Sequence, residues 1–226
     1  MTERENILAR VREALKVPAP LPGSHDDVRS HSIPPVAGAR QWLPKVGDSF
    51  EDQLALFAKN ALGLKADFQL LNLAEEMRQA LIRLRDSGSW KRVACHSGPL
   101  TDAICPMLDR PLLRTDRPYD VQALEACDVG ISECDALVAQ TGSVLVTSRS
   151  AGGRALSVLP PHHVVLARRE QLLPDLPAAF ELLKRKYAGN YPSMISFITG
   201  PSRTGDIERI LVLGAHGPKQ LTVLCF

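Results

Sequence analysis

In the first half of the chain, stretches with helical spacing of apolar residues alternate with short apolar runs. Apolar positions at helical spacing predict a helix from a Ser49 cap to Gly63, and the same spacing returns over residues 74–86. Short apolar runs at residues 68–71 and 92–95 predict strands. This alternation is typical of an α/β fold with a mostly parallel sheet flanked by helices.

The second half of the chain is richer in strand patterns. We expect one long strand over residues 129–139, a turn at 140–143, and a helix over 172–187 that begins with a proline-bearing part. Two apolar runs near the end of the chain predict a closing strand pair, 210–213 with 221–224. Three further strands are predicted at residues 144–147, 163–167 and 194–198.

The N-terminal segment has a different pattern from the rest of the chain. A capping box at residues 2–5 and a helical apolar stripe predict a helix that ends near Lys16. Six prolines then interrupt residues 17–47, so we expect a linker there and cleavage within it during limited proteolysis. The predicted domains are therefore 1–47, a helical arm with its linker, and 48–226, the α/β domain.

Composition and charge narrow the function classes. The 226 residues are 45% hydrophobic and 23% charged, which is typical of a globular protein. Lys and Arg number 27 against 25 Asp and Glu, a balance that argues against nucleic-acid binding. No apolar stretch reaches the roughly 20 residues of a membrane helix, and the N-terminus lacks a secretory pattern, so we expect a cytoplasmic protein.

The five cysteines are scattered along the chain. They have no C-x-x-C spacing, which argues against a zinc ribbon or a ferredoxin-type cluster. We expect small buried side chains in a reducing compartment, and no metal or cofactor on this chain. Any iron–sulfur chemistry would belong to a partner. These cysteines are Cys95, Cys105, Cys127, Cys134 and Cys225.

Two loops offer donors to an anion. Ser202, Arg203 and Thr204 lie between glycines after a predicted strand and before a short helix begun by Asp206, an arrangement suited to a carboxylate or phosphate. A tight capped turn is the alternative for that segment, which lacks the Gly-Lys-Ser/Thr of a Walker loop. A second loop has hydroxyls on both sides of a glycine, although a plain turn explains these residues somewhat better. Its residues are Gln140, Thr141, Gly142 and Ser143.

The remaining candidates are Arg154 and two adjacent histidines, His162 and His163. Neighbouring residues in a strand point to opposite faces, so only one of these histidines can enter a given pocket. We expect the site where the 140–143 turn meets the 202–204 loop, outside the carboxyl ends of the strands, with one histidine lining it.

Blocks of sequence in the second half resemble the LUD domain family in order and spacing. These blocks, called the LUD-like blocks below, are DVGIS (128–132), QTGS (140–143), LPPHH (159–163), GPSRTGDIE (200–208) and LGAHGP (213–218). The resemblance implies a fold related to CoA transferases, sugar-phosphate isomerases and 5-formyltetrahydrofolate cyclo-ligase. It also implies a place in a system that oxidises L-lactate to pyruvate, in which a partner subunit carries the iron–sulfur clusters.

One position departs from the family's relatives. Related CoA transferases use a glutamate in a comparable turn as acyl acceptor, whereas this chain has Gln140, whose amide cannot act as that nucleophile.

The sequence and the resemblance lead to two predicted functions. The first is a non-catalytic accessory component of an L-lactate oxidising complex, which binds a small carboxylate or its iron–sulfur oxidoreductase partners. The alternative, favoured by the anion-ready loop, is a free-standing, cyclo-ligase-like enzyme for a phosphate-bearing ligand such as a nucleotide.

Overall fold

The chain divides into two units, Met1–Leu43 and Pro44–Phe226. The computed structural model describes residues 3–14, 16, 44–204, 212–214 and 216–226. In the first unit it shows α1 (Glu3–Ala14), in agreement with the helical pattern near the N-terminus. Most of the predicted linker lies on residues outside the described ranges. The short helix predicted to begin at Asp206 lies entirely outside them.

The centre of the second unit is a six-stranded sheet in which every neighbouring pair of strands is parallel. Its strand order confirms the predicted α/β fold with a mostly parallel sheet. In spatial order the strands are β1 (Asp67–Leu70), β12 (Gln220–Cys225), β7 (His162–Ala167), β4 (Val129–Glu133), β2 (Val93–Cys95) and β3 (Leu112–Arg114).

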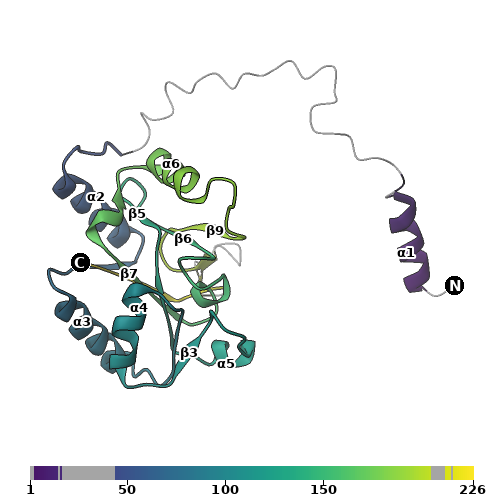
Figure 1. Cartoon of the computed structure of the whole chain (residues 1–226), viewed down its shortest axis with the longest axis horizontal. Helices are drawn as coiled ribbons and strands as arrows, with labels where there is room; N and C mark the ends of the chain where they lie inside the picture. Colours follow the sequence, from purple (N-terminus) through teal and green to yellow (C-terminus); the bar gives the residue numbers. More distant parts are fainter. Residues whose placement is uncertain (1–2, 15, 17–43, 205–211, 215) are drawn as a thin grey trace, which may run out of the picture. The chain divides into compact units, whose positions relative to one another are not determined.

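Helices cover one face of this sheet. Met77 and Leu81 of α3 (Ala74–Ser87) are fully buried with Ile131 and Val164 of the sheet, because the apolar stripe of the helix turns inward. Beside α3 lie α4 (Pro99–Ile104) and the short helix η2 (Cys105–Leu108), which complete this hydrophobic cluster. Figure 1 shows α3 and α4 on the same side of β7. A further short helix, α5 (Val121–Glu125), precedes β4.

A second, four-stranded sheet lies against the opposite face. Its order is β8 (Leu172–Leu173), β5 (Ala136–Val138), β6 (Ser143–Thr147) and β9 (Ile195–Ile198), and β6 runs antiparallel to both of its neighbours. Apolar residues of both sheets form a common cluster with α2 (Phe50–Gly63). The outer face of the second sheet is covered by α6 (Leu176–Tyr187) (Figure 1).

Two strand predictions were wrong. Residues 129–139 form two strands, β4 and β5, in different sheets, because the chain leaves the parallel sheet at Cys134 and Asp135. The predicted closing pair does not form. Instead β12 lies between β1 and β7, where its side chains from Leu221 onward are buried, and β11 (Val212–Leu213) pairs with β10 (Arg203–Thr204). Residues 210 and 211 lie outside the described part.

The helix predicted over 172–187 starts later than expected. Asp175 caps α6 by accepting a hydrogen bond from the Ala178 backbone N–H, and the two residues of β8 precede it. The cap predicted at Ser49 is confirmed, since its hydroxyl accepts from the Asp52 backbone N–H at 3.1 Å. Among the described helices, none combines the length and apolar character that crossing a bilayer requires.

Candidate functional site

A cavity of about 470 Å³ is lined by residues from both sheets. His163 of β7 and Leu221 of β12 come from the parallel sheet, and Ile195, Ser196 and Ile198 come from β9. Two loops, 199–202 and 216–218, complete the lining together with residues around η3 (Ala155–Ser157). Its volume lies within the range of about 300–1,000 Å³ that is common for ligand sites.

His163 is the most buried polar group of this lining. Its side chain is 1% exposed, and its Nε2 lies 2.9 Å from Ser132 Oγ. Its Nδ1 is buried and has no hydrogen-bond partner among the described residues. Burial lowers the pKa of His163 to about 3, so the imidazole is neutral near pH 7. Because His163 lines the cavity, a ligand there is one way to give this nitrogen a hydrogen-bond partner.

The contact between Ser132 and His163 allows two tautomers. If the Ser132 hydroxyl donates to Nε2, the proton of the ring is on Nδ1, which then acts as a donor toward a ligand. If Ser132 accepts from Nε2–H, then Nδ1 is an acceptor. Ser132 itself is fully buried and does not line the cavity, so its role is to orient the imidazole.

Arg154 brings positive charge to the cavity. This residue lines the cavity, is exposed, and forms no ion pair within the described part of the chain. No Asp or Glu is found among the described lining residues. A guanidinium without a competing carboxylate can grip a carboxylate or phosphate with two parallel hydrogen bonds. The site therefore suits an anion whose charged group stays near solvent.

The lining loop 199–202 and the segment that contains Gly214 and Pro218 are held together by backbone hydrogen bonds. Ser202 N donates to Pro218 O at 2.9 Å, and Gly214 N donates to Ser202 O at 2.9 Å. Gly200 has a φ of +85°, and a Cβ there would lie 2.8 Å from the Leu64 carbonyl oxygen, so a side chain would be both strained and crowded. These contacts hold one side of the cavity against Leu64, the residue that follows α2.

The 140–143 turn supports the cavity from behind rather than lining it. Ser143 Oγ lies 2.8 Å from both Thr141 Oγ1 and Thr199 Oγ1, and Thr199 is a lining residue. Gly142, with a φ of +64°, lies against α2. Gln140 donates weakly to Pro44 O at 3.3 Å and borders a separate groove with Thr141.

The other predicted site residues lie elsewhere. His162 points to the opposite face of the sheet, where Nε2 lies 2.9 Å from Thr222 Oγ1 and the ring contacts Trp90 edge to face. Arg203 is exposed and is not a lining residue. Thr204 belongs to β10 by its backbone, and its side chain is outside what the structure describes. Of the predicted residues, the structure thus brings Arg154, His163 and Ser202 to the cavity.

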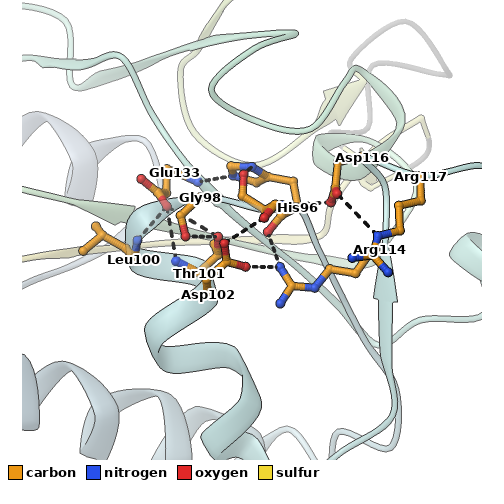
Figure 2. Close-up of polar contacts among 10 residues, drawn as sticks. His96, Gly98, Leu100, Thr101, Asp102, Arg114, Asp116, Arg117 and Glu133 are labelled. Carbon is orange, nitrogen blue, oxygen red and sulfur yellow. Dashed lines mark hydrogen bonds and ion pairs between the residues drawn. The ribbon is translucent and has the colours of Figure 1, made fainter.

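We expected the site outside the carboxyl ends of the strands. The lining loop 199–202 follows the carboxyl end of β9, whereas His163 and Leu221 lie near the amino ends of β7 and β12. A polar network occupies the carboxyl ends of β2, β3 and β4 (Figure 2). His96, just after β2, accepts from Glu133 N through Nε2 at 3.1 Å, and its Nδ1 lies 2.9 Å from Ser97 O. Burial lowers the pKa of His96.

The charged members of this network have their hydrogen-bond partners within it. Glu133 Oε1 accepts from the backbone N–H groups of Leu100 and Thr101 at the start of α4. Arg114 Nη1 donates to His96 O at 2.8 Å and to Asp102 Oδ1 at 2.5 Å (Figure 2). Because these donors and acceptors bind each other, the network holds the strand ends together, and we place the candidate site in the cavity.

Sequence reasoning missed several contributors to the site, and two of them, Ser132 and Ser157, show why. Ser132 shares a sheet face with Gly130, and their strand lies beside β7, so strand alternation could have suggested its contact with His163 had the strand order been known. Ser157 lines the cavity from η3, a short helix without a periodic signal.

Comparisons with known proteins agree with this architecture. The model of the LUD domain matches residues 55–225. A Lactate utilization protein C of Anoxybacillus flavithermus is 34% identical over 105 residues, 46% of this chain and 46% of that protein. A Lactate utilization protein C of Geobacillus kaustophilus is 37% identical over 101 residues, 44% of this chain and 42% of that protein. The aligned part of this chain thus spans less than half the length of these curated relatives.

A solved structure shares the fold. The crystal structure of a DUF162 family protein from Deinococcus radiodurans superposes with a TM-score of 0.61 at 21% identity, and the superposition covers 78% of this chain and 98% of that one. The LUD domain match extends from α2 to the end of β12 and so includes both sheets and the cavity between them. The chain belongs to the LUD domain family.

Proposed function

We propose that this protein is a component of a cytoplasmic system that oxidises L-lactate to pyruvate, and that it binds a small carboxylate in the cavity of His163. Its role in this proposal is accessory, to bind a ligand and partner proteins, and the electron transfer belongs to iron–sulfur oxidoreductase subunits. The names of relatives at 33–37% identity support the link to lactate utilisation.

The observation that carries the proposal is that the LUD-like blocks meet at the cavity. His163, Ser202 and Gly217 come from three different blocks and line it. The other two blocks contribute from behind: Ser132 bonds to His163, and Ser143 bonds to a lining threonine. Segments that carry the family resemblance therefore converge on one place, although they are far apart in sequence.

The chemistry of the lining supports carboxylate binding rather than covalent catalysis. Arg154 matches the charge of a carboxylate, and neutral His163 matches a hydroxyl or carbonyl oxygen next to it. Ser132, the hydroxyl bonded to His163, is buried behind the ring and cannot reach a ligand as a nucleophile.

The surroundings of the cysteines support placing the iron–sulfur clusters on a partner. Cys95 and Cys105 are buried in one hydrophobic cluster, Cys134 and Cys225 in another, and Cys127 in a third. Burial raises the pKa of Cys225 to about 11, which disfavours the thiolate form that ligates iron. Within the described residues, no group of three or more His, Cys, Asp or Glu side chains is arranged to hold a metal.

Growth on L-lactate tests the proposal. We expect that deletion of the gene abolishes growth on L-lactate as sole carbon source and leaves growth on glucose unchanged. The intact gene and Arg117→Gln, a change at an exposed residue outside the cavity, should restore growth, whereas His163→Leu should not. Normal growth of the deletion strain on L-lactate would exclude the proposed role.

A phosphate-bearing ligand is the second candidate. The observation in its favour is that Ser157, Thr199 and Ser202 place hydroxyl groups around the same cavity as Arg154, a set of donors that also suits phosphate oxygens. A nucleotide is the simplest such ligand, and direct binding of AMP distinguishes it from a carboxylate.

A further inference from the structure

We propose that the ligand of the cavity is a 2-hydroxy or 2-oxo acid whose apolar substituent is larger than the methyl group of lactate. This inference rests on the proposed function, because it concerns the same cavity and the same carboxylate. It goes further by assigning the oxygen on C2 to His163, the carboxylate to Arg154, and the substituent to the apolar part of the lining.

The size and lining of the cavity indicate a ligand larger than lactate. The cavity measures about 470 Å³, comparable with sites that enclose drug-sized molecules. Five side chains form its apolar part, from β9 and the residue before it, from β12 and from the segment after η3, and lactate has only a methyl group to cover them. These side chains are Val158, Met194, Ile195, Ile198 and Leu221.

The positions of the polar groups set the orientation of the ligand. Arg154 is exposed, so a carboxylate bound to it stays near water and avoids the cost of burying a charge. His163 is 1% exposed, and its unpartnered Nδ1 requires a neutral polar atom. The oxygen on C2, adjacent to the carboxylate, is such an atom.

The Ser132–His163 contact accommodates both oxidation states of the acid. A 2-hydroxy acid donates its hydroxyl proton to Nδ1 when the ring proton is on Nε2 and bonds to Ser132 Oγ. A 2-oxo acid accepts from Nδ1–H in the other neutral tautomer, in which the ring proton is on Nδ1 and the Ser132 hydroxyl donates to Nε2. The site can therefore bind the reduced and the oxidised form without a change in charge.

Calorimetric titration of the full chain with defined acids tests the inference. The probes are L-lactate, L-2-hydroxyhexanoate, hexanoate and AMP. Full burial of one methylene raises affinity by about fourfold, and of three by about sixtyfold. Partial burial of the three extra methylenes should therefore still make L-2-hydroxyhexanoate bind at least about tenfold tighter than L-lactate. Hexanoate lacks the C2 oxygen and should bind at least about fivefold more weakly than its hydroxylated counterpart.

Three variants locate the contacts. His163→Leu should remove the difference between L-2-hydroxyhexanoate and hexanoate. Ile195→Glu, at a lining position that is 39% exposed, should weaken L-2-hydroxyhexanoate at least about tenfold because it places a carboxylate in the apolar part. Met107→Glu is its matched control, since Met107 is 54% exposed and is not a lining residue, and it should bind like the wild type.

Four results would overturn the inference: L-lactate binding as tightly as L-2-hydroxyhexanoate, AMP binding more tightly than either, binding unaffected by both cavity variants, or no binding by any probe. The growth test is independent of these results. If the deletion strain fails on L-lactate while the cavity shows no preference for the longer acid, the inference falls and the proposed function stands. If instead the cavity prefers the longer acid while the deletion strain grows normally on L-lactate, the proposed function falls and the preference of the cavity for the longer acid stands.

Discussion

At the scale of single residues, the two adjacent histidines are both buried in neutral form, on opposite faces of one strand. Burial lowers the pKa of His163 to about 3 and that of His162 to about 4, from an ordinary value of 6.5. His163 lines the cavity and His162 contacts Trp90, so the same physical cause acts at the candidate site and at a packing contact.

These lowered pKa values predict a loss of stability in acid. In the unfolded chain both histidines take up protons as the pH falls through about 6.5, whereas in the folded chain they stay neutral until about pH 4 or below. The free energy of unfolding should therefore fall between about pH 6.5 and 4, by up to about 1.4 kcal/mol per pH unit for each histidine.

Urea unfolding at a series of pH values measures this loss. His162→Gln keeps a polar group near Thr222 and removes the titration, so the decline between about pH 6.5 and 4 should become shallower than in the wild type. A decline of the same steepness in His162→Gln would show that other groups cause it.

The residues of the site were predictable only in part. Strand alternation implied that one of His162 and His163 faces a pocket, and the structure places His163 there. The contact of Ser132 with His163 depends on β4 lying beside β7, which local sequence does not encode. Arg203 has the right chemistry for an anion, but its side chain is not part of the lining because β10 carries it elsewhere.

At the scale of elements, the 140–143 turn is held against α2 by a glycine that no other residue can replace without strain. Gly142 has a φ of +64°, and a Cβ there would lie 2.8 Å from Asn60 Cβ and 2.9 Å from the Ala61 backbone nitrogen. Gly189 also has a positive φ, +76°, but a Cβ there would meet nothing within 4 Å. Substitutions at Gly142 and Gly189 therefore separate the cost of backbone strain from the cost of steric crowding.

We expect Gly189→Ala to lower the free energy of unfolding by about 1–2 kcal/mol, the cost of a left-handed backbone. Gly142→Ala should lower it by at least about 1 kcal/mol more, because α2 must also move. Chemical denaturation of both variants measures the difference. Equal losses would mean that the turn yields freely and does not depend on its contact with α2.

Some helices and strands were predictable from the sequence, and others were not. The periodic helices α2 and α3 and the parallel sheet agree with the expectation because their patterns are long or strongly apolar. The second sheet was missed, since β5 and β8 are short and fully or partly buried, without alternation. The pairing of β12 between β1 and β7 follows from contacts between distant segments, which a local pattern does not show.

At the scale of the whole molecule, the hydrophobic clusters of the described residues all lie between Phe50 and Phe226. A chain shortened to residues 44–226 should therefore unfold cooperatively, with a Tm within about 4 °C of the full chain, which corresponds to less than about 1 kcal/mol for a domain of this size. Thermal melts of both chains measure this. A broad, non-cooperative melt of the shortened chain would show that residues 1–43 contribute to the core.

The central claim is that the LUD-like blocks assemble a ligand site around His163. Nitrogen-15 NMR of the histidine side chains of the full chain tests it most directly, during titration with L-2-hydroxyhexanoate. We expect the Nδ1 signal of His163 to shift as the ligand saturates the site, while the signals of His162, on the opposite face, stay in place. A titration that leaves His163 unchanged, or that shifts His162 instead, would contradict the account.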